Sequence, residues 1–238
     1  MIRFVCGVTI LLLLAGCASR PISNSGYSRH GYGGGNPMYR GELSEFDVLG
    51  VRAGTDVSEE AIRAALDEGP ERITLRRGDP VLLIQSGALM PDEEMIAHLE
   101  RDLSVTVFTG IPEREKDEDA SYASSLRLAA ARGGIGTILV YWGVLESGTQ
   151  NLATKTVSWA PIVGYAVPDE TQRMRIRLKV AAIDVRTGHW EMFTPETFED
   201  KSMSARVNRR NSDQAQVATL KSQAYEKAAG EIASRYIR

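Results

Sequence analysis

The amino terminus constrains this chain most strongly, because it determines which residues remain in the mature protein and where that protein resides. Arg3 is the only early charge, and an apolar run follows it from Val8 to Leu14. That run has the length of the apolar region of a signal peptide and is well short of the ~20 residues that a membrane-spanning helix needs. We therefore predict an exported protein whose signal peptide comprises residues 1–16.

The sequence Leu14-Ala15-Gly16-Cys17 at the end of this run resembles the lipobox of bacterial lipoproteins. The resemblance implies cleavage between Gly16 and Cys17 and acylation of Cys17, so that acyl chains anchor the protein in a membrane. One acyl chain binds reversibly, whereas the three chains of such a lipoprotein hold it firmly, since each buried methylene contributes about 0.8 kcal/mol. The alternative is a soluble periplasmic protein that is cleaved near Ala15.

The residue after the cysteine bears on which membrane receives the protein. In the lipoproteins that this box resembles, aspartate at that position often signals retention in the inner membrane, and here the position holds Ala18. We therefore expect a lipid-anchored protein on the periplasmic face of the outer membrane.

Charge and cysteine usage exclude several functions. The formal net charge is -3 and 25% of the residues are charged, which gives no general electrostatic reason to expect a nucleic-acid partner. Cys6 leaves with the signal peptide and Cys17 would carry lipid, so no thiol remains for a disulfide, a metal site or nucleophilic catalysis. We expect no cofactor.

Two segments follow the signal peptide. Residues 17–45 are predicted to be a flexible, lipid-anchored tether, because residues 19–40 are rich in Gly, Ser, Asn, Pro and Arg and show no periodicity. A flexible chain of about 22 residues spans on the order of 25 Å, which would let the domain move clear of the lipid surface. Residues 46–238 have the size of a single domain.

The first part of this domain alternates helical and extended patterns. Ser58 and Pro91 each begin an amphipathic helix, and the extended patterns are short apolar runs. Strands separated by helices pair in parallel through right-handed crossovers. The predicted helices are 59–66, 91–103 and 122–132, and the predicted strands are 81–84, 104–110 and 137–145.

The second part begins with consecutive β-rich stretches, 152–167 and 173–185, which imply an antiparallel hairpin. A strand at 190–193 and a closing alanine-rich helix at 212–235 follow. We therefore predict an α/β fold class with a mixed (α+β) sheet of four to five strands and flanking helices, arranged as a two-layer or three-layer sandwich.

The strand at 173–185 carries the most distinctive polar feature of the chain. Its even-numbered residues from Ile176 to Val180 are apolar, whereas the odd-numbered residues are cationic: Arg173, Arg175, Arg177 and Lys179. Ile183 would fall on the cationic side, so we expect a β-bulge at residues 181–182. The cationic row is a possible binding surface for an acidic protein or lipid headgroups, and the alternative is the solvent-exposed face of an antiparallel strand.

No pattern in the sequence predicts catalysis. His98 and His189 have no second His or Cys at a metal-ligand spacing. Ser86 follows a strand, as a nucleophile elbow would, but Ile84 occupies the position that needs glycine. The carboxylates of residues 92–94 lie where helix electrostatics alone would place them. We therefore predict no catalytic or metal-binding residues and a protein that is not an enzyme.

The region from Gly136 onward supplies a family resemblance. The strand Thr137–Gly143, the sequence Asp184-Val185-Arg186-Thr187-Gly188 and the alanine-rich last helix resemble the α/β domain of the curli export lipoprotein CsgG, the amino-terminal domain of TolB and the penicillin-binding-protein activator LpoB. The resemblance covers about residues 71–236. It implies an envelope protein that binds or assembles with other proteins without catalysis.

This group also contains oligomeric pore formers, so a membrane hairpin is one interpretation of residues 152–167. A barrel strand needs about 9 to 11 alternating residues, and the alternation here is brief before Pro161. A hairpin that lies on the domain is the favoured interpretation.

The sequence thus predicts a non-catalytic accessory or assembly protein of the cell envelope, with a protein partner and an oligomer possible. One alternative is an oligomeric export-channel component of the outer membrane. Another is an envelope hydrolase or peptidase with a carboxylate site.

Overall fold

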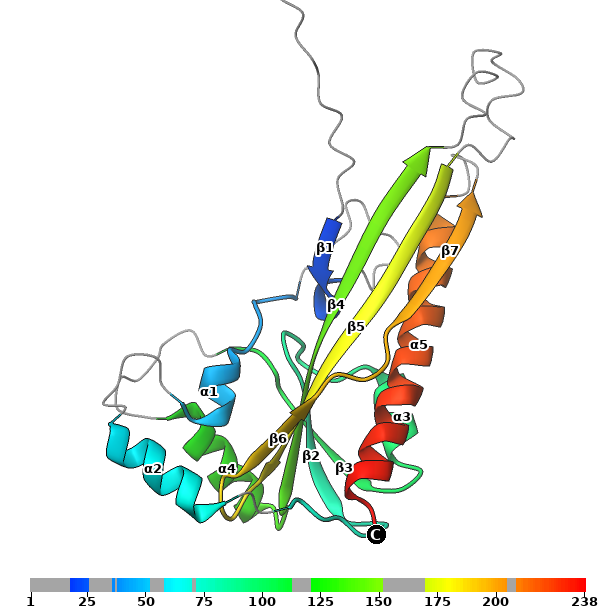
Figure 1. The fold of residues 1–238 in the computed structure, drawn as a ribbon. Coiled ribbons are helices and arrows are strands. Elements are labelled where there is room, and N and C mark those ends of the chain that lie inside the picture. The colour runs from blue at the N-terminus through cyan, green and yellow to red at the C-terminus, as the bar shows by residue number, and fades with distance from the viewer. Residues whose placement is uncertain are drawn as a thin grey trace, which may run out of the picture.

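A computed structural model describes residues 18–25, 36, 38–51, 58–69, 72–112, 121–151, 170–204 and 209–238 (Figure 1). The elements, in chain order, are β1 (Ala18–Pro21), the 3-10 turn η1 (Ile22–Asn24), α1 (Glu45–Leu49), α2 (Glu59–Glu68), β2 (Pro80–Gln85), α3 (Glu93–Leu99), β3 (Ser104–Phe108), α4 (Tyr122–Arg132), β4 (Thr137–Asn151), β5 (Glu170–Asp184), β6 (Trp190–Phe193), β7 (Phe198–Ser204) and α5 (Arg209–Tyr236).

One mixed sheet of seven strands forms the centre of the described structure. Its main path is β3-β2-β4-β5-β6, with β1 added beside β4 and β7 beside β5. β2 is parallel to β3 and β4, and the remaining pairs are antiparallel. The α/β class and the parallel first part are confirmed. The sheet has more strands than predicted because β4 and β5 are 15 residues long, which leaves room for β1 and β7 beyond β2 and β6.

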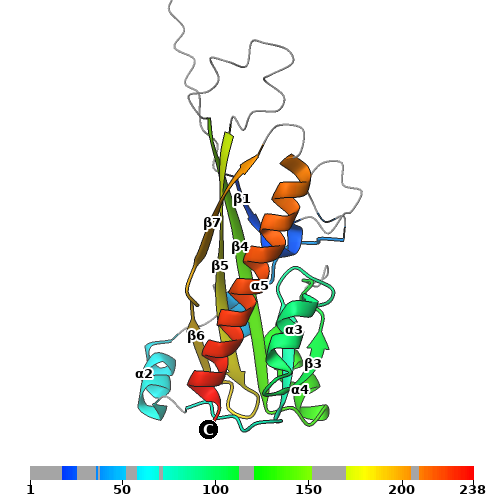
Figure 2. The same cartoon turned by 90° about the vertical axis from the view of Figure 1, so that its right-hand side faces the viewer.

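Helices cover both faces of the sheet, so the sandwich has three layers (Figures 1 and 2). α3 and α5 pack on one face around Met95, Tyr141 and Leu220, all of which are fully buried. α1 and α4 pack on the other face around Val48 and Leu126. The two apolar cores are therefore separated by the strands.

The long strands β4 and β5 extend to what we call the hairpin end of the sheet, where β4 stops at Asn151 and β5 starts at Glu170. α5 covers one face there, because the even-numbered residues Met174 and Ile176 belong to its core. The opposite face has half-exposed Arg175 and Arg177 side chains (47% and 52%). We call this face, on β4, β5 and β7, the open face.

The expected β-bulge at residues 181–182 is wrong. β4 and β5 pair without interruption from Thr137 opposite Asp184 to Asn151 opposite Glu170. Ile183 therefore lies on the same face as the cationic row, yet it is buried in the core under α1 and α4. The face changes from apolar to charged because α1 and α4 cover only its half far from the hairpin end.

The prediction of a flexible tether over residues 17–45 also needs correction for the described part. β1 pairs with β4 over four residues, from Ala18 opposite Ser147 to Pro21 opposite Val144. Ile22 is 1% exposed and Leu43 is 4% exposed, and each belongs to one of the two cores. Backbone pairing and burial of these apolar side chains hold the segment on the domain despite its composition.

The predicted hairpin between residues 152–167 and 173–185 has a different first strand, because β5 pairs with β4 along its whole length. Residues 152–167 lie outside the described residues, as do Gly16 and Cys17. Among the described residues, no helix has both the length and the apolar character to cross a membrane.

Candidate functional site

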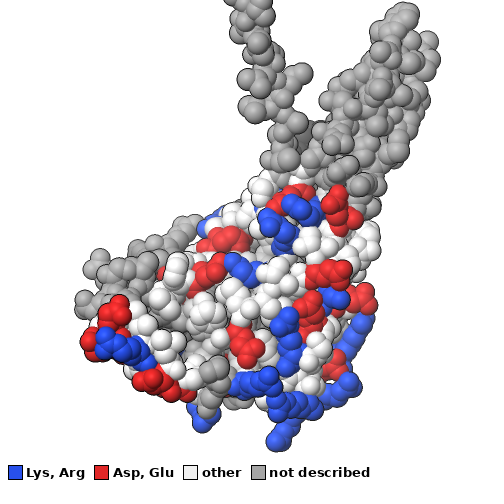
Figure 3. Space-filling model, viewed as in Figure 1, with Lys and Arg blue, Asp and Glu red and all other residues white. Residues whose placement is uncertain are grey.

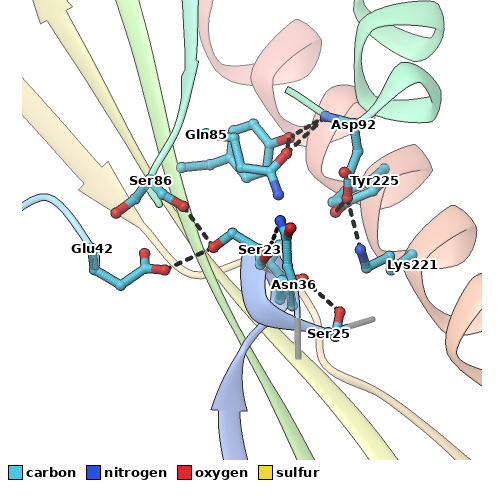
Figure 4. Close-up of polar contacts among 11 residues, drawn as sticks. Ser23, Ser25, Asn36, Glu42, Gln85, Ser86, Asp92, Lys221 and Tyr225 are labelled. Carbon is cyan, nitrogen blue, oxygen red and sulfur yellow. Dashed lines mark hydrogen bonds and ion pairs between the residues drawn. The ribbon is translucent and has the colours of Figure 1, made fainter. Parts of the chain in front are cut away.

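The carboxyl end of β2 is the place where this topology favours a site. From β2 the chain passes through α3 to β3 on one side, and then through α4 to β4 on the other side. Open α/β sheets bind ligands outside the carboxyl ends of the strands at such a reversal of strand order. Two polar clusters lie there on opposite faces of the sheet, one beside Gln85 and one beside Ser86 (Figure 4).

The Asp92 cluster lies between β2, α3 and α5 and contains Gln85, Asp92, Tyr141, Lys221 and Tyr225. The Asp92 carboxylate accepts hydrogen bonds from Lys221 Nζ, at 3.0 Å, and from the Tyr225 hydroxyl. Gln85 Oε1 accepts from the Asp92 backbone N–H at 2.7 Å and from the Tyr141 hydroxyl at 2.6 Å. The Asp92 and Lys221 side chains are only 3% and 9% exposed. The cluster thus fixes the start of α3 to α5 and β2.

The two phenols of this cluster act as hydrogen-bond donors and not as acids. Burial, reinforced by the nearby Asp92 carboxylate, raises the pKa of Tyr141 and of Tyr225 well above the ordinary value of 10.0. The only carboxylate of the cluster is already paired with an ammonium group. Gln85 Nε2 is buried without a hydrogen-bond partner among the described residues, which costs stability. The five residues of the cluster include one carboxylate and no serine, cysteine or histidine.

The Ser86 cluster lies on the other face and joins the carboxyl end of β2 to the amino-terminal segment. Ser23 Oγ lies 2.7 Å from Glu42 Oε1 and 2.8 Å from the Ser86 carbonyl oxygen. Ser86 Oγ accepts a hydrogen bond from the Leu43 backbone N–H at 2.8 Å. Ser86 is 1% exposed, and no histidine belongs to the cluster in the described part of the chain. Its hydroxyl therefore serves as a hydrogen-bond partner of the chain itself.

Gly87 shows how tightly the amino-terminal segment fills this position. Its φ is +76°, and an added Cβ would lie 2.4 Å from Glu42 Oε1, 2.7 Å from Ser23 Oγ and 2.8 Å from Tyr39 Cε2. A side chain at residue 87 would thus collide with Ser23, which follows β1, and with Tyr39 and Glu42, which precede α1. The place where related topologies hold a ligand is occupied here by the chain's own residues.

Glu42 makes the contribution of the Ser86 cluster to folding stability depend on pH. Burial raises the pKa of Glu42 above 4.5, although hydrogen bonds from Ser86, Ser23 and Tyr39 partly offset this. The folded chain thus holds this proton to a higher pH than the unfolded chain does. Stability therefore falls as the pH rises from about 4.5 through the raised pKa.

We expect the stability of the Glu42→Gln variant to lack this decrease with pH, because glutamine is neutral and can still accept the Ser23 hydrogen bond. Urea unfolding at a series of pH values should show the variant gaining stability relative to the natural chain between pH 4.5 and neutrality. Parallel pH profiles of the two proteins would contradict the assignment.

The cationic row lies elsewhere, on β5. Arg175 and Arg177 both pair with Glu146 of β4, and Lys179 pairs with Glu45 of α1. The Arg175 and Arg177 guanidinium groups hold the pKa of Glu146 below its ordinary value. Arg173 is placed by its backbone pairing with Gly148. The side chains of Arg175, Arg177 and Lys179 are thus paired with two carboxylates, Glu146 being shared by the two arginines, and the view in Figure 3 shows both signs of charge interspersed.

Sequence patterns missed the Asp92 cluster. The sequence places Asp92 in the acidic first turn of a helix, and it does occupy the cap position of α3, but its side chain makes no capping hydrogen bond. Its partner Lys221 lies 129 residues away. Within the described ranges, no group of three or more His, Cys, Asp or Glu side chains could hold a metal ion.

Comparison with known proteins identifies the family. The family model described as YafT bacterial lipoprotein matches residues 44–235, which is most of the chain. The chain belongs to the YafT family of bacterial lipoproteins. Membership supports attachment to the cell envelope through lipid, and the resemblance to CsgG, TolB and LpoB stays a prediction. No curated protein matches this YafT-family chain.

Among solved structures, the chain is similar to a neuraminyllactose-binding hemagglutinin homologue from Helicobacter pylori. The two are 12% identical, and the match covers 69% of this chain and 86% of the other with a TM-score of 0.29. A similarity at this level transfers no property of that protein to the YafT-family chain.

Proposed function

We propose that this YafT-family protein is a non-catalytic, lipid-anchored accessory or assembly protein of the cell envelope that presents a protein-binding surface. We place its anchor at Cys17 and its location on the periplasmic face of the outer membrane, as Ala18 suggests. Family membership supports the lipid anchor. The observation that carries the non-catalytic assignment is the filled carboxyl end of β2, where Ser86 is buried under Leu43.

A catalytic site at this position would need an accessible nucleophile beside a base, or paired carboxylates. The Ser86 cluster contains one carboxylate, Glu42, which is engaged with Ser23. The Asp92 cluster contains one carboxylate, which is engaged with Lys221. In each cluster the carboxylate is engaged in a contact that joins distant segments of the chain.

The open face is the surface that we assign to the protein partner. No helix that the structure describes covers the open face, and its charged side chains form a row across three strands: Glu146 on β4, Arg175 on β5 and Glu199 on β7. Arg177 extends the row by its bond to Glu146. Interspersed charges of both signs favour selective pairing with a complementary surface over attraction to any anion.

The test is photo-crosslinking in intact cells, with p-benzoylphenylalanine in place of Glu199. We expect a discrete crosslinked product with one protein. The product should disappear in an Arg175→Glu/Arg177→Glu background, because charge reversal removes complementarity. It should persist in an Arg101→Glu/Arg132→Glu background, which reverses two exposed cations outside the open face.

Two results would contradict the proposal. One is a product that is unchanged by reversal of Arg175 and Arg177 while both variants keep the unfolding temperature of the parent chain. The other is a hydrolase or peptidase activity of the purified protein that Ser86→Ala abolishes at unchanged stability, which would give that hydroxyl a chemical role.

A further inference from the structure

We propose that the hairpin end of the sheet rests against the headgroup layer of the membrane, so that the domain has one fixed orientation on a lipid surface. This inference rests on the lipid anchoring of the proposed function. It goes further because it names the part of the fold that contacts lipid.

The first step concerns the short covalent connection between the anchor at Cys17 and the domain. Ala18 already pairs with Ser147 as the first residue of β1. Residue 17 is joined to Ala18 by one peptide bond, and consecutive Cα atoms lie only 3.80 Å apart across a trans peptide. A lipid on Cys17 is therefore attached directly to the sheet.

The second step is the strength with which β1 and η1 are held. Ile22 is 1% exposed in the core under α5, and it packs so closely on Gly143 that a Cβ there would lie 2.4 Å from Ile22 Cδ1. Ser23 Oγ donates to the carbonyl oxygen of Ser86, the residue directly after β2. Asn36 Nδ2 donates to the Ser23 carbonyl at 3.0 Å. Residues 18–25 are thus part of the domain, and an anchor on Cys17 would be joined to a strand that is itself held in the sheet.

The third step concerns the direction in which β4 and β5 extend past Ala18. β1 is antiparallel to β4, so Ala18 is the residue of β1 nearest the hairpin end, as Figure 1 shows. β4 continues from Ser147 to Asn151, which extends the strand by on the order of 13 Å at about 3.3 Å per residue. The headgroup layer is only about 5–8 Å thick on each side of a bilayer. Because this extension exceeds the thickness of the headgroup layer, the hairpin end is the described part of the domain that would reach the lipid surface first.

The orientation has a consequence for the other end of the molecule. α2, α4 and the carboxyl end of α5 lie at the end of the sheet opposite the hairpin end (Figure 1). They would face the periplasm. The open face, whose strands lead to the hairpin end, would stand close to the membrane, within reach of a partner that is itself bound there.

The test uses single cysteines, since the mature chain has no cysteine except the acylated one. Thr149→Cys lies at the hairpin end, Glu199→Cys lies on β7 level with Arg175, and Leu128→Cys lies on α4. Each full-length, lipidated variant carries an NBD fluorophore and is reconstituted in phosphatidylcholine vesicles that contain a headgroup nitroxide lipid. We expect quenching to decrease in the order 149, 199, 128, with at least a threefold difference between the first and the last.

Vesicle flotation separates the two levels of the hypothesis. The parent chain should float with vesicles and Cys17→Ser should not, and a parent chain that fails to float overturns both the anchoring and the orientation. Flotation with equal quenching at all three positions overturns the orientation alone, as does strongest quenching at residue 128. Gly143→Ala in each of the three single-cysteine backgrounds should reduce the difference in quenching between positions, because it loosens residues 18–25.

Discussion

Lys221→Met is expected to destabilise the protein by about 3–5 kcal/mol, because it leaves the Asp92 carboxylate buried without its cation. The two side chains are 9% and 3% exposed and lie 3.0 Å apart, so water cannot replace the lost ammonium group easily. Methionine keeps most of the volume, which separates the loss of charge from the loss of packing. The free energy of unfolding in urea is the measurement.

Lys227→Met is the matched control, because Lys227 lies on the same helix and pairs with Glu196 in an exposed position (42% and 66%). We expect a change of at most about 1 kcal/mol there. The double variant Asp92→Asn/Lys221→Met should be more stable than Lys221→Met alone, since it contains no unpaired buried charge. A double variant that is less stable than Lys221→Met would contradict this account of the Asp92 cluster.

Gly143→Ala is expected to cost about 1–3 kcal/mol and to loosen the amino-terminal segment. The added Cβ would lie 2.4 Å from Ile22 Cδ1 and 2.8 Å from Leu178 Cδ2, and neither side chain has space to withdraw because both are buried in the same core. Urea unfolding measures the loss of stability. Hydrogen exchange of the amides of residues 18–25 should become faster than in the parent chain.

Gly136→Ala is the control for this variant, because nothing lies within 4 Å of its added Cβ, and we expect a change within about 0.5 kcal/mol. Ile22→Ala should partly compensate Gly143→Ala, so the double variant should lose less stability than the sum of the single changes. Strict additivity would show that Ile22 and Gly143 are not coupled.

Much of the fold follows from local patterns. The helix after Ser58, which caps it by accepting from the Ala61 N–H, and the central strand at 81–84 were predicted close to their observed bounds. Periodicity and caps are properties of a few neighbouring residues, and here tertiary contacts agree with them. The order of helices and strands then predicted the parallel pairs of β2.

The errors concern residues whose structure depends on distant partners. β1 has the sequence Ala-Ser-Arg-Pro, which shows no strand pattern, and it is extended because β4 offers an unpaired edge at the hairpin end. β7, from Phe198 to Ser204, was missed for the same reason beside β5. The bulge was wrongly predicted because one strand can have an apolar half and a charged half on a single face when helices cover only part of it.

The candidate site was less predictable than the fold. The sequence places Ser86 after a strand and Asp92 before a helix. It does not show that the Leu43 backbone bonds to Ser86 or that Lys221 pairs with Asp92. Both contacts join segments far apart in the chain, and a single sequence contains no signal for them. The cationic row was visible, yet its partners Glu146 and Glu45 lie on other elements.

The pairing of β1 with β4 also determines how the protein responds to mechanical force. Hydrogen bonds in an antiparallel pair run perpendicular to the strands, so tension applied at Ala18 along the axis of β1 loads all four residue pairs at once. Tension applied across the strands would break them one after another. Force applied to the lipid anchor along this axis therefore acts in shear on the whole β1–β4 pair. It is transmitted directly to β4 and β5, the longest strands of the sheet.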